Sequence, residues 1–304
     1  VSTEAHDPST GRLTLAQASL PGQAVPLFSM GYHHTPAGDV DLRTDFVAGR
    51  TESFGYDGVD RLSTWTLASP TQGFATRTTG YAYDDLGNLT GVSVDGVQVE
   101  QATYGWLGKP HALATLGGAA YAYDARGRQT DGPARTATYT EADLPRQLTT
   151  KGLAPEVVDF AYDADGHRVR KATATETTTY VGGLYERRRA SASTTHVFYV
   201  SGEDGAALQV THDEGSQLDA TSYFAADALG SVQVVLDEAG AVVERRFYEP
   251  FGACVADDGT AVAAAVTDVH RGFTGHEEDA ETGLVNMRGR MYDPTDRKST
   301  RLNS

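Results

Sequence analysis

The stretch YAYDDLGNLTGVSV, residues 81–94, carries the pattern that decides the fold. Tyr81 and Tyr83 are two positions apart, so in a strand their rings lie on one face while Ala82 faces the other way. Asp84 can accept hydrogen bonds from the amides of a following turn, and Gly87 tolerates the left-handed backbone that such a turn needs. The stretch therefore predicts a strand, a tight turn and a second strand.

Other segments repeat this pattern of aromatic, small residue, Tyr, Asp, two variable positions and then Gly or Asp. The clear copies are FGYDGVDRLSTWT from Phe54, YAYDARGRQT from Tyr121 and FAYDADGHRVRKA from Phe160, and weaker ones begin at Tyr104 and Tyr139. The expected turns are centred on Asp60, Gly87, Gly127 and Gly166. Because an isolated hairpin buries too little surface to persist, we expect residues 1–175 to form a succession of stacked hairpins.

The chain beyond residue 175 still alternates as strands do, but it no longer repeats. Residues 231–252, SVQVVLDEAGAVVERRFYEPFG, predict a hairpin whose turn spans Asp237 to Gly240. No segment rich in Pro or Ser separates the two parts. The sequence therefore predicts an all-β chain with repeats at 1–175 and a non-repeating region at 176–295.

Composition narrows the possible partners. The 304 residues include 33 Gly and 15 Tyr, which favours strands and turns. Acidic residues outnumber basic ones 41 to 25, so a nucleic acid is not an expected partner. No apolar run approaches the roughly 20 residues that a membrane-spanning helix needs, and no membrane span is expected. The chain starts at Val1 without a basic and apolar leader, so a signal peptide is expected to be absent or to lie upstream.

The Tyr-Asp-x-x-Gly register is followed, in order, by YVGGLYE, ADALGSVQVVLDEAGAVVE, FYEPFG and GFTGHEEDAETGLVNMRGRMYDP. This series resembles the Rhs and YD-repeat family and its repeat-associated core over nearly the whole chain. The resemblance implies YD-repeat hairpins that form part of a spirally wound β-sheet shell, with a C-terminal Rhs core region at residues 176–295. The family includes bacterial polymorphic toxins, insecticidal toxin complexes and the related animal teneurins.

The same resemblance implies a function. In the family's toxins the shell encloses a variable C-terminal effector, and the core acts as an aspartyl-type self-cleaving protease that frees it. The expected partners are then the chain's own effector and secretion or toxin-complex components, and the expected location is outside a bacterial cell or on its surface.

Two candidate catalytic residues follow from the resemblance. Arg290 matches the family's arginine before Tyr-Asp-Pro, where a guanidinium would orient a carboxylate and stabilise charge at the scissile peptide. The alternative for Arg290 is a strand arginine in a surface ion pair. Asp293 is a nearby carboxylate, although its place before Pro294 also suits a turn. An aspartyl mechanism needs two carboxylates with separated pKa values, and the second acidic motif is missing, so the site is expected to be incomplete and the chain inactive alone.

The final segment has a different origin. Residues 296–304, DRKSTRLNS, are the in-frame translation of a common sequencing-adapter string. We therefore expect this segment not to be native and the chain to be a fragment of a longer gene.

Other functions find less support in the sequence. The acidic run Glu277, Glu278 and Asp279 predicts a solvated edge in preference to a metal cluster. No nucleotide-binding, metalloprotease or hydrolase motif occurs, so no cofactor or metal is expected. The alternative function is a cell-surface adhesion or carbohydrate-binding module, since tyrosine-rich β repeats offer aromatic faces to sugars. Inward-facing aromatic side chains would favour the shell, and an exposed row of coplanar Tyr would favour sugar binding.

Overall fold

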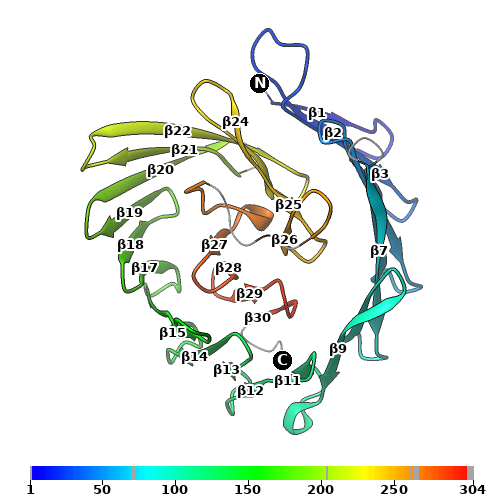
Figure 1. Ribbon diagram of the computed structural model, residues 1–304, viewed down its shortest axis with the longest axis vertical. Coiled ribbons are helices and arrows are strands. Elements are labelled where there is room, and N and C mark those ends of the chain that lie inside the picture. Colours follow the sequence, from blue (N-terminus) through cyan, green and yellow to red (C-terminus); the bar gives the residue numbers. More distant parts are fainter. Residues whose placement is uncertain (1, 70–72, 203–204, 261, 263–266, 300–304) are drawn as a thin grey trace.

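The computed structural model describes residues 2–69, 73–202, 205–260, 262 and 267–299. Within these residues the only helices are two short 3-10 turns, η1 (Trp106–Gly108) and η2 (Phe273–Gly275). Two antiparallel sheets form a curved wall, and a C-terminal segment lies inside it (Figure 1). In the described part of the chain no helix has the length and apolar character to cross a membrane. The predicted all-β class is confirmed.

The first sheet contains 11 strands in chain order. They are β1 (Ser2–His6), β2 (Leu13–Ala18), β3 (Phe28–His34), β4 (Val40–Asp45), β5 (Arg50–Tyr56), β6 (Leu62–Ser69), β7 (Phe74–Tyr83), β8 (Leu89–Val94), β9 (Val97–Tyr104), β10 (Leu113–Leu116) and β11 (Ala119–Ala120).

The second sheet contains 13 strands, again in chain order. They are β12 (Ala122–Tyr123), β13 (Gln129–Asp131), β14 (Arg135–Tyr139), β15 (Pro145–Thr150), β16 (Val157–Tyr162), β17 (Arg168–Ala172), β18 (Glu176–Val181), β19 (Tyr185–Ala190), β20 (Thr194–Gly202), β21 (Gly205–Asp213), β22 (Leu218–Ala226), β23 (Val232–Leu236) and β24 (Val242–Arg245). The sheet continues across residues 175 and 176, because β17 pairs with β18.

The repeat turn has the geometry that its sequence predicts. In the copy that follows β7, Asp84 Oδ1 accepts hydrogen bonds from the amides of Leu86, at 3.0 Å, and Asn88, at 2.8 Å. Gly87 has a φ of 81°, in the left-handed region. Asp60, Gly127 and Gly166 occupy the same turn position, with φ values of 61°, 81° and 82°. The four predicted hairpins are confirmed.

A register shift precedes the Tyr of each clear copy. The pairing of β7 with β8 shifts between Ala82 and Tyr83, and the shifts at the other copies fall at Gly55/Tyr56, Ala122/Tyr123 and Ala161/Tyr162. Such irregularities bend a strand and increase its twist, so their repetition helps the wall to curve.

The same turn recurs beyond the repeats. Asp227 Oδ1 accepts hydrogen bonds from the amides of Leu229 and Ser231, and Asp237 Oδ1 accepts one from Ala241. The second of these turns joins β23 to β24, which confirms the hairpin predicted at Asp237 to Gly240. Hairpins with this turn geometry therefore continue to the end of the wall.

Tyrosine hydroxyl groups connect successive hairpins. Each of four repeat tyrosines donates a hydrogen bond to a backbone carbonyl earlier in the wall, which joins its hairpin to the one before. The pairs are Tyr56 to Val40 at 2.7 Å, Tyr83 to Leu62 at 2.9 Å, Tyr104 to Leu89 at 2.8 Å and Tyr139 to Gln129 at 2.5 Å. These rings are part of the packing between hairpins and do not form an exposed row.

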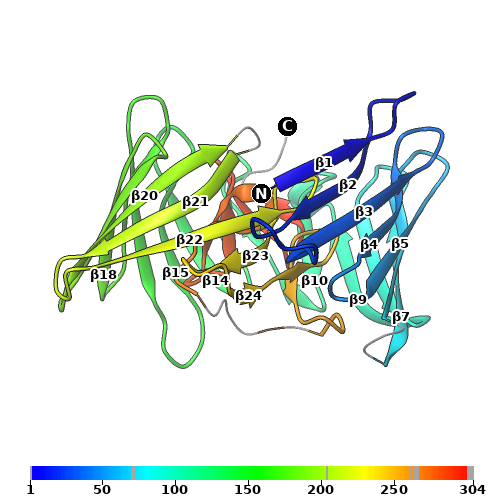
Figure 2. The same cartoon turned by 90° about the horizontal axis from the view of Figure 1, so that it is seen from above.

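The beginning and the end of the wall meet through side chains. Phe28, Met30 and Tyr32 of β3 pack in one buried cluster with Val234 and Leu236 of β23. Figures 1 and 2 show these two regions side by side, so the wall closes around its interior. Ion pairing adds to the closure, since Arg43 of β4 lies 3.2 Å from Asp227.

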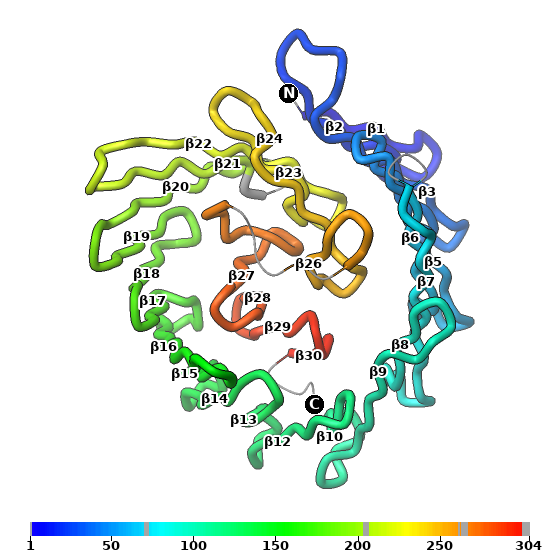
Figure 3. Tube along the Cα trace, in the orientation of Figure 1, coloured from blue at the N-terminus to red at the C-terminus, as the bar shows by residue number. Residues whose placement is uncertain are grey.

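The chain then enters the space that the wall surrounds (Figure 3). This inner segment, residues 247–260, 262 and 267–299, contains a two-stranded and a four-stranded sheet. Its strands are β25 (Phe247–Tyr248), β26 (Cys254–Val255), β27 (Glu277–Asp279), β28 (Leu284–Asn286), β29 (Met291–Asp293) and β30 (Lys298–Ser299). Leu284 and Met291 pack on Leu148 and Phe160 of the wall, which anchors the inner segment to the second sheet.

Candidate functional site

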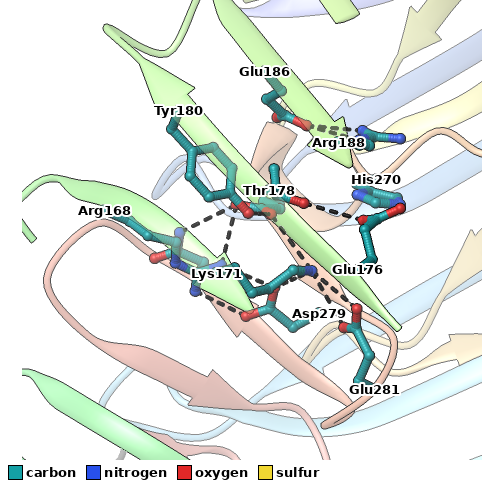
Figure 4. A network of polar contacts seen from close by, with 12 residues as sticks. Arg168, Lys171, Glu176, Thr178, Tyr180, Glu186, Arg188, His270, Asp279 and Glu281 are labelled. Atoms are coloured by element: carbon teal, nitrogen blue, oxygen red, sulfur yellow. Dashed lines mark hydrogen bonds and ion pairs between the residues drawn. The ribbon is translucent and has the colours of Figure 1, made fainter. Parts of the chain in front are cut away.

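The inner segment is held to the wall by buried charges. Arg168 of β17 contacts both oxygens of Asp279 on β27, at 2.9 and 2.8 Å, in a bidentate ion pair (Figure 4). The guanidinium of Arg168 also lies 4.6 Å from the centre of the Phe160 ring. Asp279 has no exposed surface, so this contact lies in a site without bulk water.

A second cation from the same strand extends the network. Lys171 Nζ lies 3.1 Å from Asp279 and 3.2 Å from Glu281, which is only partly buried. Tyr180 of β18 donates a hydrogen bond of 2.5 Å to Glu277. The wall therefore supplies two cations and a hydroxyl to three carboxylates of the inner segment.

The ionisation of these groups depends on the contact. Burial alone would raise the pKa of Asp279, but Arg168 and Lys171 outweigh burial and hold that pKa below its usual value. Burial alone would lower the pKa of Lys171, but Asp279, Glu277 and Glu281 raise it above its usual value. Both partners therefore stay charged when the inner segment is docked.

The sequence interpretation of the acidic run needs a correction. Glu277 and Asp279 were expected on a solvated edge, but they are only 6% and 0% exposed. Their partners Arg168 and Lys171 are more than 100 residues earlier in the chain, so local charge pattern could not reveal them. The run is a buried attachment point.

Another arginine of the second sheet makes a similar contact with the inner segment. Arg188 of β19 forms an ion pair with Glu186 of the same strand at 2.9 Å (Figure 4). It also forms one with Asp268 of the inner segment at 2.8 Å. Arg188 is 2% exposed, whereas the side chain of Asp268 is two-thirds exposed. This pair therefore anchors the inner segment near solvent.

Asp293, one of the two predicted catalytic residues, is buried at the end of β29. It is 5% exposed, and its Oδ2 lies 2.6 Å from Nη1 of Arg135 on β14. Its Oδ1 accepts a hydrogen bond of 2.8 Å from the amide of Thr295, so the carboxylate also closes a local turn. Both interpretations of Asp293, as a functional acid and as a turn former, are compatible with this geometry.

Arg290, the other predicted residue, lies in the turn that joins β28 to β29. Its side chain is exposed, and its carbonyl accepts a hydrogen bond of 2.9 Å from the amide of Met287. The buried arginine that contacts Asp293 is Arg135, which no sequence motif indicated. The sequence contains one weak indication of this role: Arg135 is a charged residue at a strand position that alternation places on the buried face.

The space beside Asp293 admits a second carboxyl group. Asp296 is 5% exposed, and burial together with the charge of Asp293 raises the pKa of Asp296 to about 8. Asp296 belongs to the segment that the sequence predicts to be non-native, so we assign it no role. Its position shows that residues following Asp293 can bring an acid to this buried place.

Two further groups of residues were candidates for catalysis or metal binding: Cys254, and the cluster of Asp163, Asp165 and His167. Burial raises the pKa of Cys254 to about 11, which keeps the thiol protonated at neutral pH. Asp163, Asp165 and His167 offer ligand atoms within 4.8 Å of one another, but all three are exposed, and Asp163 already accepts the hydrogen bonds of its repeat turn.

The teneurin YD-shell family profile matches residues 47–296. The chain belongs to the YD-shell family. The match covers the first sheet from β5 onward, the whole second sheet and most of the inner segment, and it agrees with the Rhs and YD-repeat resemblance of the sequence.

Two curated relatives of this YD shell are nucleases. The chain is 25% identical over 223 residues to the tRNA3(Ser)-specific nuclease WapA of Bacillus spizizenii, and 24% identical over 223 residues to the tRNA nuclease WapA of Bacillus subtilis. Each alignment covers 70% of this chain and 9% of the relative. The chain therefore corresponds to a small part of these proteins.

Solved structures share the fold of this YD shell. The crystal structure of TcdB2-TccC3 superposes with a TM-score of 0.82 at 21% identity, and covers 99% of this chain and 17% of that chain. The Photorhabdus luminescens Tc holotoxin pore gives a TM-score of 0.80 at 22% identity, and covers 100% of this chain and 17% of that one. At these identities the likeness concerns the fold.

Proposed function

We propose that this chain is the shell wall and core region of a bacterial Rhs-type toxin whose longer parent cleaves itself at a bond downstream of Asp293. Residues 1–175 supply YD repeats and residues 176–295 supply the core region. The observation that carries the proposal is the placement of Asp293: a buried carboxylate inside the wall, held by the guanidinium of Arg135. Paired acids with separated pKa values are what an aspartyl-type mechanism requires.

The proposal includes the fate of the released piece. The wall curves around the inner segment (Figure 3). The C-terminal effector of the parent would remain in this enclosed space after cleavage, as the chain's principal partner. The parent would act outside the producing cell or on its surface, together with secretion or toxin-complex components.

The first test uses the chain extended through its authentic downstream sequence, with a C-terminal epitope tag. On a denaturing gel the extended protein should separate into two pieces, whereas the 304-residue chain should stay intact because it lacks the second acidic motif. Asp293→Asn, which keeps the shape of the side chain, should leave the extended protein uncut. An extended wild-type protein that remains a single band would refute self-cleavage.

The second test addresses enclosure. After cleavage the tagged piece should elute with the wall in size-exclusion chromatography and should resist added protease until the wall is unfolded. Immediate digestion of the tagged piece under native conditions would mean that the wall does not enclose it.

The adhesion alternative gains no specific support. The tyrosines of the repeat copies are buried or half-buried, and four of them donate their hydroxyl groups to neighbouring hairpins. This arrangement favours a shell over an aromatic platform for sugars.

A further inference from the structure

We propose that Arg135, a residue of the wall, is the positioning residue for Asp293 in self-cleavage. The inference rests on the proposed function and assigns the orienting guanidinium to a strand 158 residues away from the acid. The acid would then adopt its working geometry only when the inner segment is docked on the second sheet.

The geometry of the pair supports this role. Arg135 Nη1 and Asp293 Oδ2 are 2.6 Å apart, a short charge-assisted hydrogen bond. The two residues are 9% and 5% exposed, so little water competes for either group. A buried carboxylate that lost this partner would be left without a compensating charge.

The wall fixes the backbone of Arg135. Its carbonyl accepts a hydrogen bond of 3.0 Å from Gly132, and β14 pairs it with Thr150 of β15. Its Nε has no hydrogen-bond acceptor among the described residues. Arg135 therefore contacts Asp293 from a strand paired in the wall and retains a donor for a further acceptor at the site.

Arg290 differs from Arg135 in its surroundings. Arg290 is exposed in the turn between β28 and β29, on the inner segment itself. Arg135 is buried and belongs to the wall. The contact with Arg135 therefore makes the orientation of Asp293 depend on docking of the inner segment on the wall.

The pH dependence of cleavage distinguishes positioning from general support. Among the described residues, the charged or titratable groups near Asp293 are Arg135, Tyr121, Tyr292, Asp296, Arg297 and Lys298. Arg135 is the cation in contact with the acid, and a guanidinium favours the ionised form of a carboxylate.

The test compares variants of the extended, self-cleaving chain. Arg135→Gln should slow cleavage on the order of 10–100-fold and move the acidic limb of the pH–rate profile to higher pH. Arg135→Lys restores the positive charge but not the planar guanidinium with its several donors. It should return the acidic limb toward its wild-type position, with partial recovery of the cleavage rate.

The matched control is Arg168→Gln. Arg168 is also a buried wall arginine that anchors the inner segment, but its partner is Asp279. This variant should weaken docking, as measured by thermal melts, and leave the acidic limb in place. The inference is overturned if Arg135→Gln keeps the wild-type pH profile, or if Arg168→Gln shifts the acidic limb by the same amount. If Arg135→Gln does not fold, the inference is overturned when Arg135→Lys cleaves with the wild-type rate and pH profile. An extended wild-type chain that does not cleave removes the proposed function itself, and this inference with it.

Discussion

At the scale of single residues, position in the turn decides what an aspartate does. Asp84 and Asp85 are neighbours of the same type, yet Asp84 accepts the hydrogen bonds of its repeat turn and Asp85 is exposed. In the equivalent turn, hydrogen bonds from the backbone amides of Arg61 and, with a smaller effect, Val59 hold the pKa of Asp57 below its usual value. The Asp of the Tyr-Asp pair is therefore a structural acceptor in its ionised form.

This difference can be tested directly. Asp84→Ala should reduce the free energy of unfolding by about 1–2 kcal/mol, because amides of the turn lose their acceptor. Asp85→Ala should change it by less than about 0.5 kcal/mol. Both are measured by denaturant unfolding followed by circular dichroism. Equal effects of the two substitutions would show that the turn does not depend on the Asp84 carboxylate.

At the scale of strands and hairpins, the sequence predicts what is local. The alternation at Tyr81 and Tyr83 and the turn at Gly87 depend on adjacent residues, and both are found as expected. The burial of Asp279 depends on Arg168, which is 111 residues earlier, and the sequence interpretation of that run was wrong. Contacts between distant strands follow from the winding of the wall, which no single hairpin encodes.

The contact of β27 with β17 should contribute strongly to stability. Asp279→Asn should lower the free energy of unfolding by about 3–5 kcal/mol, because Arg168 and Lys171 would remain buried with one fewer anion. Glu281→Gln is the matched control: Glu281 meets the same Lys171 nearer to solvent, and its loss should cost about 1 kcal/mol or less. The readout is the midpoint of urea unfolding. An Asp279→Asn midpoint equal to that of wild type would mean that this contact does not stabilise the docked inner segment.

At the scale of the whole molecule, closure depends on side chains. The first and the last part of the wall meet through the cluster around Tyr32 and Leu236 and through the pair of Arg43 and Asp227. The family resemblance implied a shell, and the wall is consistent with it. Which arginine contacts Asp293 could not be predicted, since that contact joins β14 to a strand of the inner segment 158 residues later in the chain.

The outer edge of β1 pairs with no other described strand. β1 lies at the end of the first sheet, and all its residues from Ser2 to His6 are exposed. Unpaired edge strands form pairs with other chains. The 304-residue chain, expressed alone, should therefore associate, and light scattering should report a mass above 32.4 kDa.

Two variants locate the contact that causes this association. Lysines at positions 3 and 5, Thr3→Lys with Ala5→Lys, place positive charges on the β1 edge and should shift the chain toward monomer. Phe198→Lys removes the exposed ring of β20, which is 46% exposed on the face of the second sheet, and should leave the association unchanged. If only Phe198→Lys gives monomer, the sheet face and not the edge is responsible. A monodisperse wild-type monomer would contradict the prediction altogether, because it would show that β1 is protected without a partner strand.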